Sequence, residues 1–321
     1  MVTSQMKGRV LVTGGAGFIG SHVTDHYLQL GYEVTVVDDL STGKVENVPK
    51  AAEFVHADIG SPEVRQLLEQ TGFDVLNHHA AQMDVRTSVS DPTFDARINI
   101  LGFLNLLEGA RAGGTGRVVF ASSGGVVYGE SDDLPHREEA RKLPVSPYGV
   151  SKLTSEFYLA AYAQLYGMKC VSMRYANVYG PRQNPHGEAG VVAIFCSRIK
   201  RGEALTVFGD GGQTRDYVFV GDVARANMAA TNWPVKSIHT IDAVAFNVGT
   251  AIETSVNDLA STLMDATARQ VPIDRVPERP GELARSAVAI DRAASELVWK
   301  PKTTLSEGLK QTYDWIAETS V

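Results

Sequence analysis

The chain has 321 residues, with 37 acidic and 30 basic side chains and a net charge of −7. A hydrophobic fraction of 44% excludes a disordered chain, and the acidic balance argues against a broad nucleic-acid-binding surface. The two cysteines are too few for a disulfide framework, no apolar run is long enough to cross a bilayer, and residues 1–8 lack the apolar stretch of a signal peptide. We therefore expect a cytoplasmic protein with neither a membrane nor a nucleic-acid partner.

Short β-branched runs alternate with longer helical patterns in the first half of the chain. The runs are apolar on both faces, which favours buried parallel strands. We expect strands at Arg9–Thr13, Glu33–Val37, Glu53–His56, Asp74–Asn77, Arg117–Ala121 and Lys169–Met173, and helices near 18–30, 62–71, 92–112 and 147–166. This order predicts an α/β fold of the Rossmann type, a doubly wound parallel sheet with its ligand crevice at the carboxyl ends of the strands.

After about residue 180 the pattern changes to loops and glycine-rich turns. We expect one domain over 1–180, to which a segment near 217–250 returns. A smaller, partly discontinuous lobe over 181–321 is expected to cover the crevice, with helices at 191–201 and 305–318.

A glycine-rich turn, TGGAGFIG at 13–20, links the first predicted strand to the first predicted helix. Glycines there permit a tight turn and the close approach of a pyrophosphate, which the helix N-terminus faces. Asp38 ends the second strand, 18 residues after Gly20, where an acid accepts the ribose hydroxyls and repels a 2′-phosphate. The motif therefore favours NAD over NADP, and the alternative is a glycine turn with an unrelated surface aspartate. The residues assigned to the cofactor on this basis are Gly14, Gly17, Phe18, Ile19, Gly20 and Asp38.

A second group of polar residues lies at the expected crevice. Tyr148 and Lys152 are four residues apart at the start of a predicted helix, and Ser123 follows the fifth strand. A tyrosine with the ordinary pKa near 10 is a poor base at neutral pH, so it needs a neighbouring ammonium and a positive nicotinamide ring. Tyrosine–lysine pairs at this spacing are common on helix surfaces, and only together with the nucleotide motif does this one indicate catalysis.

With these motifs the sequence resembles the extended short-chain dehydrogenase/reductase superfamily, specifically nucleotide-sugar enzymes of the UDP-galactose 4-epimerase type. The resemblance covers nearly the whole chain, through TGGAGFIGSH at 13–22, VDDLSTG at 37–43, HHAAQ at 78–82, SSGGVVYGE at 122–130, SPYGVSK at 146–152, RYANVYGPRQ at 174–183, FGDGGQTRDYVFVGD at 208–222 and RPGE at 279–282. It implies bound NAD, a catalytic Ser/Tyr/Lys group and a nucleoside-diphosphate sugar held by the C-terminal lobe.

The resemblance also implies roles for single residues. Ser123, Tyr148 and Lys152 would be catalytic, with Tyr148 the base and Lys152 also holding the nicotinamide ribose. Further cofactor contacts are implied for Asp58, Ile59, Ala80, Ala81 and Gln82. Substrate contacts are implied for Ser123, Asn177, Arg215, Arg279 and Ser286, and guanidinium groups among them suit a diphosphate.

Ser286 lies seven positions after the expected diphosphate ligand Arg279. In the epimerase type a tyrosine at this position excludes an N-acetyl group beside C2. A serine leaves that space open, so the resemblance implies measurable turnover of an N-acetylated sugar as well. An alignment shifted by one residue would place Arg285 or Ala287 there instead.

The residues after Ser123 bear on the reaction. Enzymes resembling 4,6-dehydratases carry an Asp-Glu pair there, whereas this chain has Gly124 and Gly125. Without an acid for the leaving hydroxyl, elimination lacks a partner. We expect a 4-epimerase of UDP-glucose and UDP-galactose that acts through a 4-keto intermediate. The alternatives are a 4-epimerase of UDP-glucuronate or UDP-N-acetylglucosamine, another enzyme of the extended family, and a non-catalytic NAD sensor, which would need neither Tyr148 nor Lys152.

Other polar residues are assigned no chemistry. His22 and His26 have a zinc-like spacing without a third ligand, so we expect helix packing and no metal. The acidic residues at 132–133 and 138–139 are expected in solvent. Family members of this type dimerise through helices corresponding to 92–112 and 147–167, which implies a homodimer.

Overall fold

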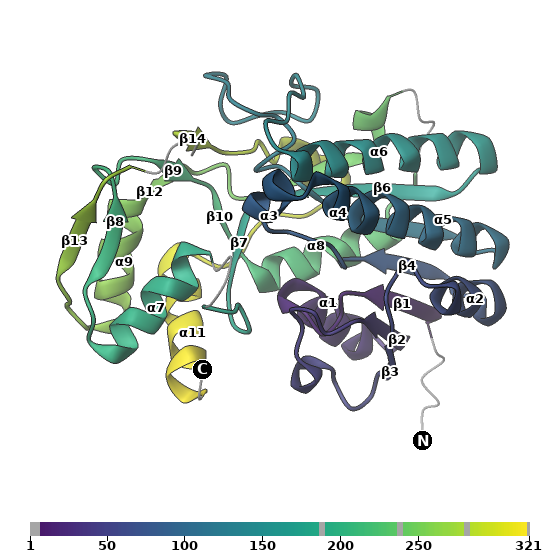
Figure 1. Ribbon diagram of the computed structural model, residues 1–321, viewed down its shortest axis with the longest axis horizontal. Coiled ribbons are helices and arrows are strands. Elements are labelled where there is room, and N and C mark those ends of the chain that lie inside the picture. Colours follow the sequence, from purple (N-terminus) through teal and green to yellow (C-terminus); the bar gives the residue numbers. More distant parts are fainter. Residues whose placement is uncertain (1–6, 186–189, 236–239, 279–282, 320–321) are drawn as a thin grey trace.

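A parallel sheet of seven strands forms the centre of the molecule, in the order β11-β6-β5-β4-β1-β2-β3 (Figure 1). The computed structural model describes residues 7–185, 190–235, 240–278 and 283–319. The strands are β1 (Arg9–Thr13), β2 (Glu33–Asp38), β3 (Glu53–His56), β4 (Val75–His78), β5 (Arg117–Ser123), β6 (Lys169–Tyr175) and β11 (Ala245–Val248). Strand order reverses between β1 and β4, so the sheet is doubly wound, as predicted.

Helices cover both faces of this sheet. On one face lie α2 (Pro62–Thr71), α5 (Phe103–Ala112) and α6 (Pro147–Tyr166), and on the other lie α1 (Phe18–Gln29) and α8 (Val220–Asn232). Along β1 the side chains alternate between the two cores, because Leu11 packs with the first group while Val10 and Val12 pack with the second. This two-sided burial explains why the strands are apolar throughout.

The predicted helix over 92–112 is interrupted. It consists of α4 (Pro92–Ala96), a π-helical turn η2 (Arg97–Gly102) and α5, and the short α3 (Val85–Ser90) precedes it. In the π-helical turn the amide of Asn99 donates hydrogen bonds to the Gln82 carbonyl oxygen at 2.8 Å and to Asp95 Oδ1 at 2.9 Å. A widened turn at this point gives a helix side chain access to the loop after β4.

A smaller lobe lies beside the carboxyl ends of the strands (Figure 1). Its core combines α7 (Val191–Arg201), α9 (Val256–Thr267), α11 (Leu305–Glu318) and β8 (Leu205–Phe208). The largely exposed strand β13 (Ile273–Val276) pairs with β8. Between lobe and sheet run β7 (Asn177–Tyr179), β9 (Thr214–Arg215), β10 (Tyr217–Phe219), β12 (Thr254–Ser255) and β14 (Arg285–Ser286). The remaining elements are η1 (Val45–Asn47), η3 (Ile241–Val244) and α10 (Asp291–Glu296). No helix in the described ranges is long and apolar enough to cross a membrane.

Helix α5 packs on α2 through glycine. A Cβ atom on Gly113 would lie 2.1 Å from the Leu68 carbonyl oxygen, and one on Gly109 would lie 3.0 Å from the Arg65 carbonyl oxygen. Since the backbone of Gly113 has a negative φ of −79°, the restriction comes from contact with α2 and not from backbone strain.

We expect Gly113→Ala to lower the free energy of unfolding by about 1–3 kcal/mol, because the added methyl group forces the two helices apart. Ala112→Ser is the matched control, since its side chain is exposed and should change stability by no more than about 0.5 kcal/mol. Urea unfolding followed by circular dichroism measures both. Equal midpoints for the two variants would contradict the packing argument.

Candidate active site

The glycine turn between β1 and α1 has no room for a side chain at Gly14 or Gly20. Gly14 has a φ of +70°, and a Cβ there would lie 2.5 Å from the Ala80 backbone nitrogen. A Cβ on Gly20 would lie 2.2 Å from the Gly14 carbonyl oxygen. Gly17 is the N-cap of α1, no described side chain caps this helix, and Phe18 and Ile19 form its first turn. The turn therefore fits a pyrophosphate bound by backbone N–H groups at the helix N-terminus.

Asp38 lies at the carboxyl end of β2, beside this turn. Its Oδ2 accepts a hydrogen bond from the Ala16 backbone N–H at 3.0 Å, and its Oδ1 accepts one from Leu40 N–H at 2.9 Å. Burial raises the pKa of Asp38, against the two hydrogen bonds, which lower it. Because each carboxylate oxygen has a second lone pair, the fixed group can still accept hydrogen bonds from ribose hydroxyls.

The loop after β4 carries Ala80, Ala81 and Gln82 along the same crevice. The Gln82 backbone N–H donates to Asn99 Oδ1 at 3.0 Å, and its side-chain amide donates to Asp95 Oδ1 at 3.0 Å. The hydrogen bonds of the π-helical turn thus fix this loop. Sequence reasoning missed Asp95 and Asn99, since nothing in their spacing distinguishes them from other helical polar residues.

Asp58 and Ile59 follow β3 and face different surroundings. Asp58 is exposed, its Oδ1 accepts a hydrogen bond from Gly60 N–H at 2.7 Å, and it lines a pocket with Arg97 and Leu101. The Ile59 side chain is buried in the core beneath α2 and α5. Of the two, only Asp58 therefore presents its side chain to a ligand.

Tyr148 and Lys152 lie on adjacent turns at the start of α6. The Ser146 hydroxyl caps this helix by accepting a hydrogen bond from Gly149 N–H at 3.2 Å, which fixes where the helix begins. Lys152 Nζ lies 5.7 Å from the centre of the Tyr148 ring and donates to the Ala121 carbonyl oxygen at 2.8 Å. Because Ala121 precedes Ser123 by two residues on β5, this contact joins the helix to the end of the strand.

The Lys152 ammonium is almost completely buried, with 4% of the residue exposed. Burial lowers the pKa of Lys152 to about 8, while the charges of Asp95 and Glu156 act to raise it. At neutral pH the ammonium is therefore mostly charged. A positive charge at this position stabilises the phenolate form of Tyr148.

The expected substrate residues lie on the strands between sheet and lobe. Asn177 is exposed on β7, and Arg215 is on β9, where it pairs across the strands with Ser286 of β14. Ser286 is buried, whereas its neighbour Arg285 is exposed and paired with Glu253. Arg279 lies outside the described residues. The structure thus brings Arg215 and Ser286 side by side.

Two further expectations have different outcomes. The expectation that the acidic residues at 132–133 and 138–139 lie in solvent is wrong for Glu138 alone: it is buried, and its Oε1 accepts a hydrogen bond from Asn247 N–H at 2.9 Å. His22 packs within the fold as expected, with Nε2 3.0 Å from the Pro181 carbonyl oxygen, and burial lowers its pKa to about 4. Across the described residues, no three His, Cys, Asp or Glu side chains are grouped to hold a metal ion.

Comparison with known proteins defines the class. Residues 10–249 match the model of the NAD dependent epimerase/dehydratase family. The UDP-glucose 4-epimerase of Mycolicibacterium smegmatis is 43% identical over 317 residues, which cover 97% of this chain and 99% of the relative. The chain belongs to the NAD dependent epimerase/dehydratase family, which confirms the resemblance seen in its motifs.

Solved structures give the same result. The UDP-glucose 4-epimerase of Thermotoga maritima, solved with UDP-glucose, matches with a TM-score of 0.89 and 43% identity, over 96% of this chain and 98% of that one. The UDP-glucose 4-epimerase of Thermus thermophilus, solved with NAD, matches with a TM-score of 0.89 and 43% identity, over 98% and 100% of the two chains.

We expect Lys152 to titrate near pH 8 in the cofactor-free protein, because burial lowers its pKa. ¹³C NMR of reductively methylated protein, with Lys152→Arg to assign the signal, measures this. The signals of solvent-exposed lysines serve as the internal control, since an ammonium in water titrates near the ordinary value of about 10.4. A Lys152 signal that also titrates near that value would contradict the stated effect of burial.

Proposed function

We propose that this protein is an isomerase, an NAD-dependent 4-epimerase that interconverts UDP-glucose and UDP-galactose through a 4-keto intermediate. The observation that carries the proposal is the pairing of Tyr148 with a buried, charged Lys152 at the end of β5. Membership of the family and the 43% identity to UDP-glucose 4-epimerases support it. NAD is the cofactor of this family.

The residues around the glycine turn are proposed to hold NAD. Backbone N–H groups of the first turn of α1, at Phe18 and Ile19, would bind the pyrophosphate, and Asp38 would bind the ribose of the adenosine half. When bound, NAD⁺ supplies a reversible oxidation of the sugar at C4. Because Gly14 and Gly20 carry no side chains, the pyrophosphate of NAD could approach the protein backbone between this turn and the loop after β4.

Tyr148, Lys152 and Ser123 are proposed to handle the proton. The Tyr148 phenolate takes the proton of the C4 hydroxyl as the 4-keto sugar forms, and returns it when the opposite face is reduced. Lys152 stabilises the phenolate and binds the nicotinamide ribose. Ser123, half-buried at the end of β5, holds the C4 oxygen by a hydrogen bond.

The residues after Ser123 favour epimerisation over elimination. Gly124 N–H donates to the Tyr175 carbonyl oxygen at 2.8 Å, and a Cβ on Gly124 would lie 2.8 Å from Val288 Cγ1. A side chain at this position would press on Val288. With glycine at both 124 and 125, no acid is present there to protonate a leaving hydroxyl.

We further propose that 1–180, with the segment near 217–250, forms the cofactor domain and that 181–321 forms the sugar-binding lobe. Asn177, Arg215 and Arg279 would bind the nucleoside diphosphate, since guanidinium groups bind phosphate through paired hydrogen bonds. Both cysteines are free and buried, which suits the reducing cytoplasm that we propose as its location.

The proposed function is tested by incubating the purified protein with UDP-glucose, UDP-galactose, their N-acetylated counterparts and UDP-glucuronate, and then separating the products. We expect interconversion of the first pair, release of NAD on denaturation, and no accumulation of NADH. Stoichiometric NADH formation would contradict epimerisation, and faster turnover of UDP-glucuronate than of UDP-glucose would favour the alternative sugar.

Tyr148→Phe should lower kcat by about 10²–10⁴-fold while folding and NAD content stay close to those of the native protein, because only the proton acceptor is lost. Tyr158→Phe on the same helix is the matched control and should keep full activity. Steady-state rates and the NAD released on denaturation measure the effect. Near-native turnover by Tyr148→Phe would show that another group is the base.

Ser286→Tyr tests the space beside C2 of the sugar. We expect the native protein to turn over UDP-N-acetylglucosamine measurably, because Ser286, which pairs with Arg215 across the strands, lacks the aromatic ring that would exclude an acetyl group. The variant should lose this activity and keep turnover of UDP-glucose and UDP-galactose. The control Ser261→Tyr, on the exposed face of α9, should keep both activities. The measurement is kcat/KM for both sugar pairs, and an equal loss for both would remove Ser286 from specificity.

A homodimer through helices 92–112 and 147–167 is also proposed. Exposed apolar side chains lie along these helices, among them Leu101 at 60%, Phe157 at 56% and Leu165 at 71% exposure. Large apolar side chains that gather on one surface are typical of protein interfaces.

We expect the double variant Phe157→Glu/Leu165→Glu to be a monomer, because it places charges in the proposed interface. Ile252→Glu, a substitution of an equally exposed apolar residue in the other lobe, should leave the dimer intact. Sedimentation velocity distinguishes the two states. A native protein that sediments as a monomer would rule the interface out.

A further inference from the structure

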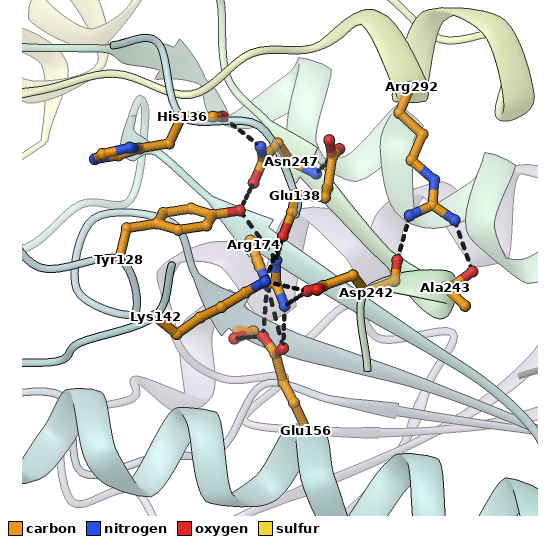
Figure 2. Close-up of polar contacts among 11 residues, drawn as sticks. Tyr128, His136, Glu138, Lys142, Glu156, Arg174, Asp242, Ala243, Asn247 and Arg292 are labelled. Carbon is orange, nitrogen blue, oxygen red and sulfur yellow. Dashed lines mark hydrogen bonds and ion pairs between the residues drawn. The ribbon is translucent and has the colours of Figure 1, made fainter. Parts of the chain in front are cut away.

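The guanidinium of Arg174, on β6, is completely buried and fully hydrogen-bonded (Figure 2). Nε donates to Glu156 Oε1 at 3.0 Å, and Nη2 donates to Glu156 Oε2 at 2.6 Å and to Asp242 Oδ1 at 2.8 Å. Nη1 donates to the Tyr128 hydroxyl at 3.0 Å and to the Glu138 carbonyl oxygen at 2.8 Å. These contacts use all five N–H donors of an arginine side chain.

Glu156 connects this arginine to the candidate active site. It lies on α6 one turn after Lys152, with 1% of its surface exposed. Its Oε1 also accepts a hydrogen bond from the Ser122 hydroxyl at 2.5 Å. Ser122 is the residue before Ser123, so one carboxylate joins the helix of Tyr148 and Lys152 to the strand end that carries Ser123.

The same cluster holds the connection between β5 and α6. Lys142 Nζ donates to the Glu138 carbonyl oxygen at 2.6 Å and pairs with Asp242 at 2.5 Å. The Tyr128 hydroxyl donates to Asn247 Oδ1 at 2.7 Å. Figure 2 shows these side chains around Arg174, contributed by α6, the connection, η3 and β11. The chain between Ser123 and Tyr148 is therefore anchored near both ends to one buried group.

Fold stability alone does not require charged residues at this place. A buried ion pair loses hydration on folding, and apolar residues of similar volume often serve stability equally well. Contacts between apolar residues are not directional, whereas five hydrogen bonds from a planar guanidinium fix the orientation of every partner. A charged pair at this junction therefore suits a requirement for precise placement.

We propose that Arg174 and Glu156 are positioning residues, which set the Tyr148–Lys152 turn of α6 relative to Ser123. The proposal rests on the catalytic roles proposed above for these three residues. A displacement of reacting groups by about 1 Å can lower a rate by about 10²-fold. The pair should accordingly act on kcat and leave the glycine turn and its NAD undisturbed.

The test compares Arg174→Met, Glu156→Leu and the double variant. Each single variant leaves one buried charge without its partner, so we expect loss of stability and of activity together. The double variant removes both charges. We expect its urea midpoint and NAD content to return close to native values, while kcat for UDP-galactose stays lowered by about 10²-fold with little change in KM.

Arg117→Met is the matched control, because Arg117 lies at the opposite end of β5 and donates to the carbonyl oxygens of Ala230 at 2.9 Å and Trp233 at 2.8 Å. It should lower stability and leave kcat unchanged. A double variant with recovered stability and native kcat would show that the pair is purely structural and overturn the proposal.

If the double variant does not fold, Ser122→Ala gives the answer, since it removes only the hydrogen bond between β5 and Glu156. A lowered kcat with native stability supports positioning, and a native kcat overturns it. Failure of the proposed function can be distinguished from failure of this inference. If the native protein turns over no UDP-sugar, both are contradicted. If the native protein is active and the double variant is equally active, only this inference is contradicted.

Discussion

The buried ammonium of Lys152 imposes the condition that the rest of the site satisfies. A lysine out of water stays charged only if acceptors and negative charges lie near it, and here they are the Ala121 carbonyl oxygen, Asp95 and Glu156. Each carboxylate has further partners. Asp95 accepts a hydrogen bond from Gln82 in the loop after β4, and Glu156 forms an ion pair with Arg174. The groups that keep the lysine charged are thus the groups that fix the walls of the crevice.

Much of the cofactor half could be predicted from the sequence. Strands buried on both faces are recognised by their apolar composition. The elements that place the glycine turn, Asp38, Tyr148 and Lys152 lie close to these residues in sequence. Arg174 and Glu138 could not be assigned in this way, because their partners Asp242 and Asn247 come from a distant segment. Glu156 did carry a signal, since it lies one helical turn after Lys152.

The departures from the expected helices have a similar origin. The pattern over 92–112 is helical throughout, whereas the π-helical turn within it accompanies a hydrogen bond from Asn99 to Gln82, in a loop elsewhere in the chain. Helices α8 and α9 were not predicted individually, although α9 has a local signal, since the Ser255 hydroxyl caps it by accepting a hydrogen bond from Asp258 N–H. Helix propensity predicts the details of a helix only where the residues that contact it are also close in sequence.

The position of β11 has a consequence for synthesis on the ribosome. This strand completes the sheet by pairing with β6, yet α7, α8 and several short strands lie between the two in sequence. Until it emerges, the nascent chain exposes the hydrogen-bonding edge of β6, and Arg174 lacks Asp242. An open strand edge favours pairing with other chains. The first half of the molecule is therefore most prone to aggregate during the interval between translation of β6 and translation of β11.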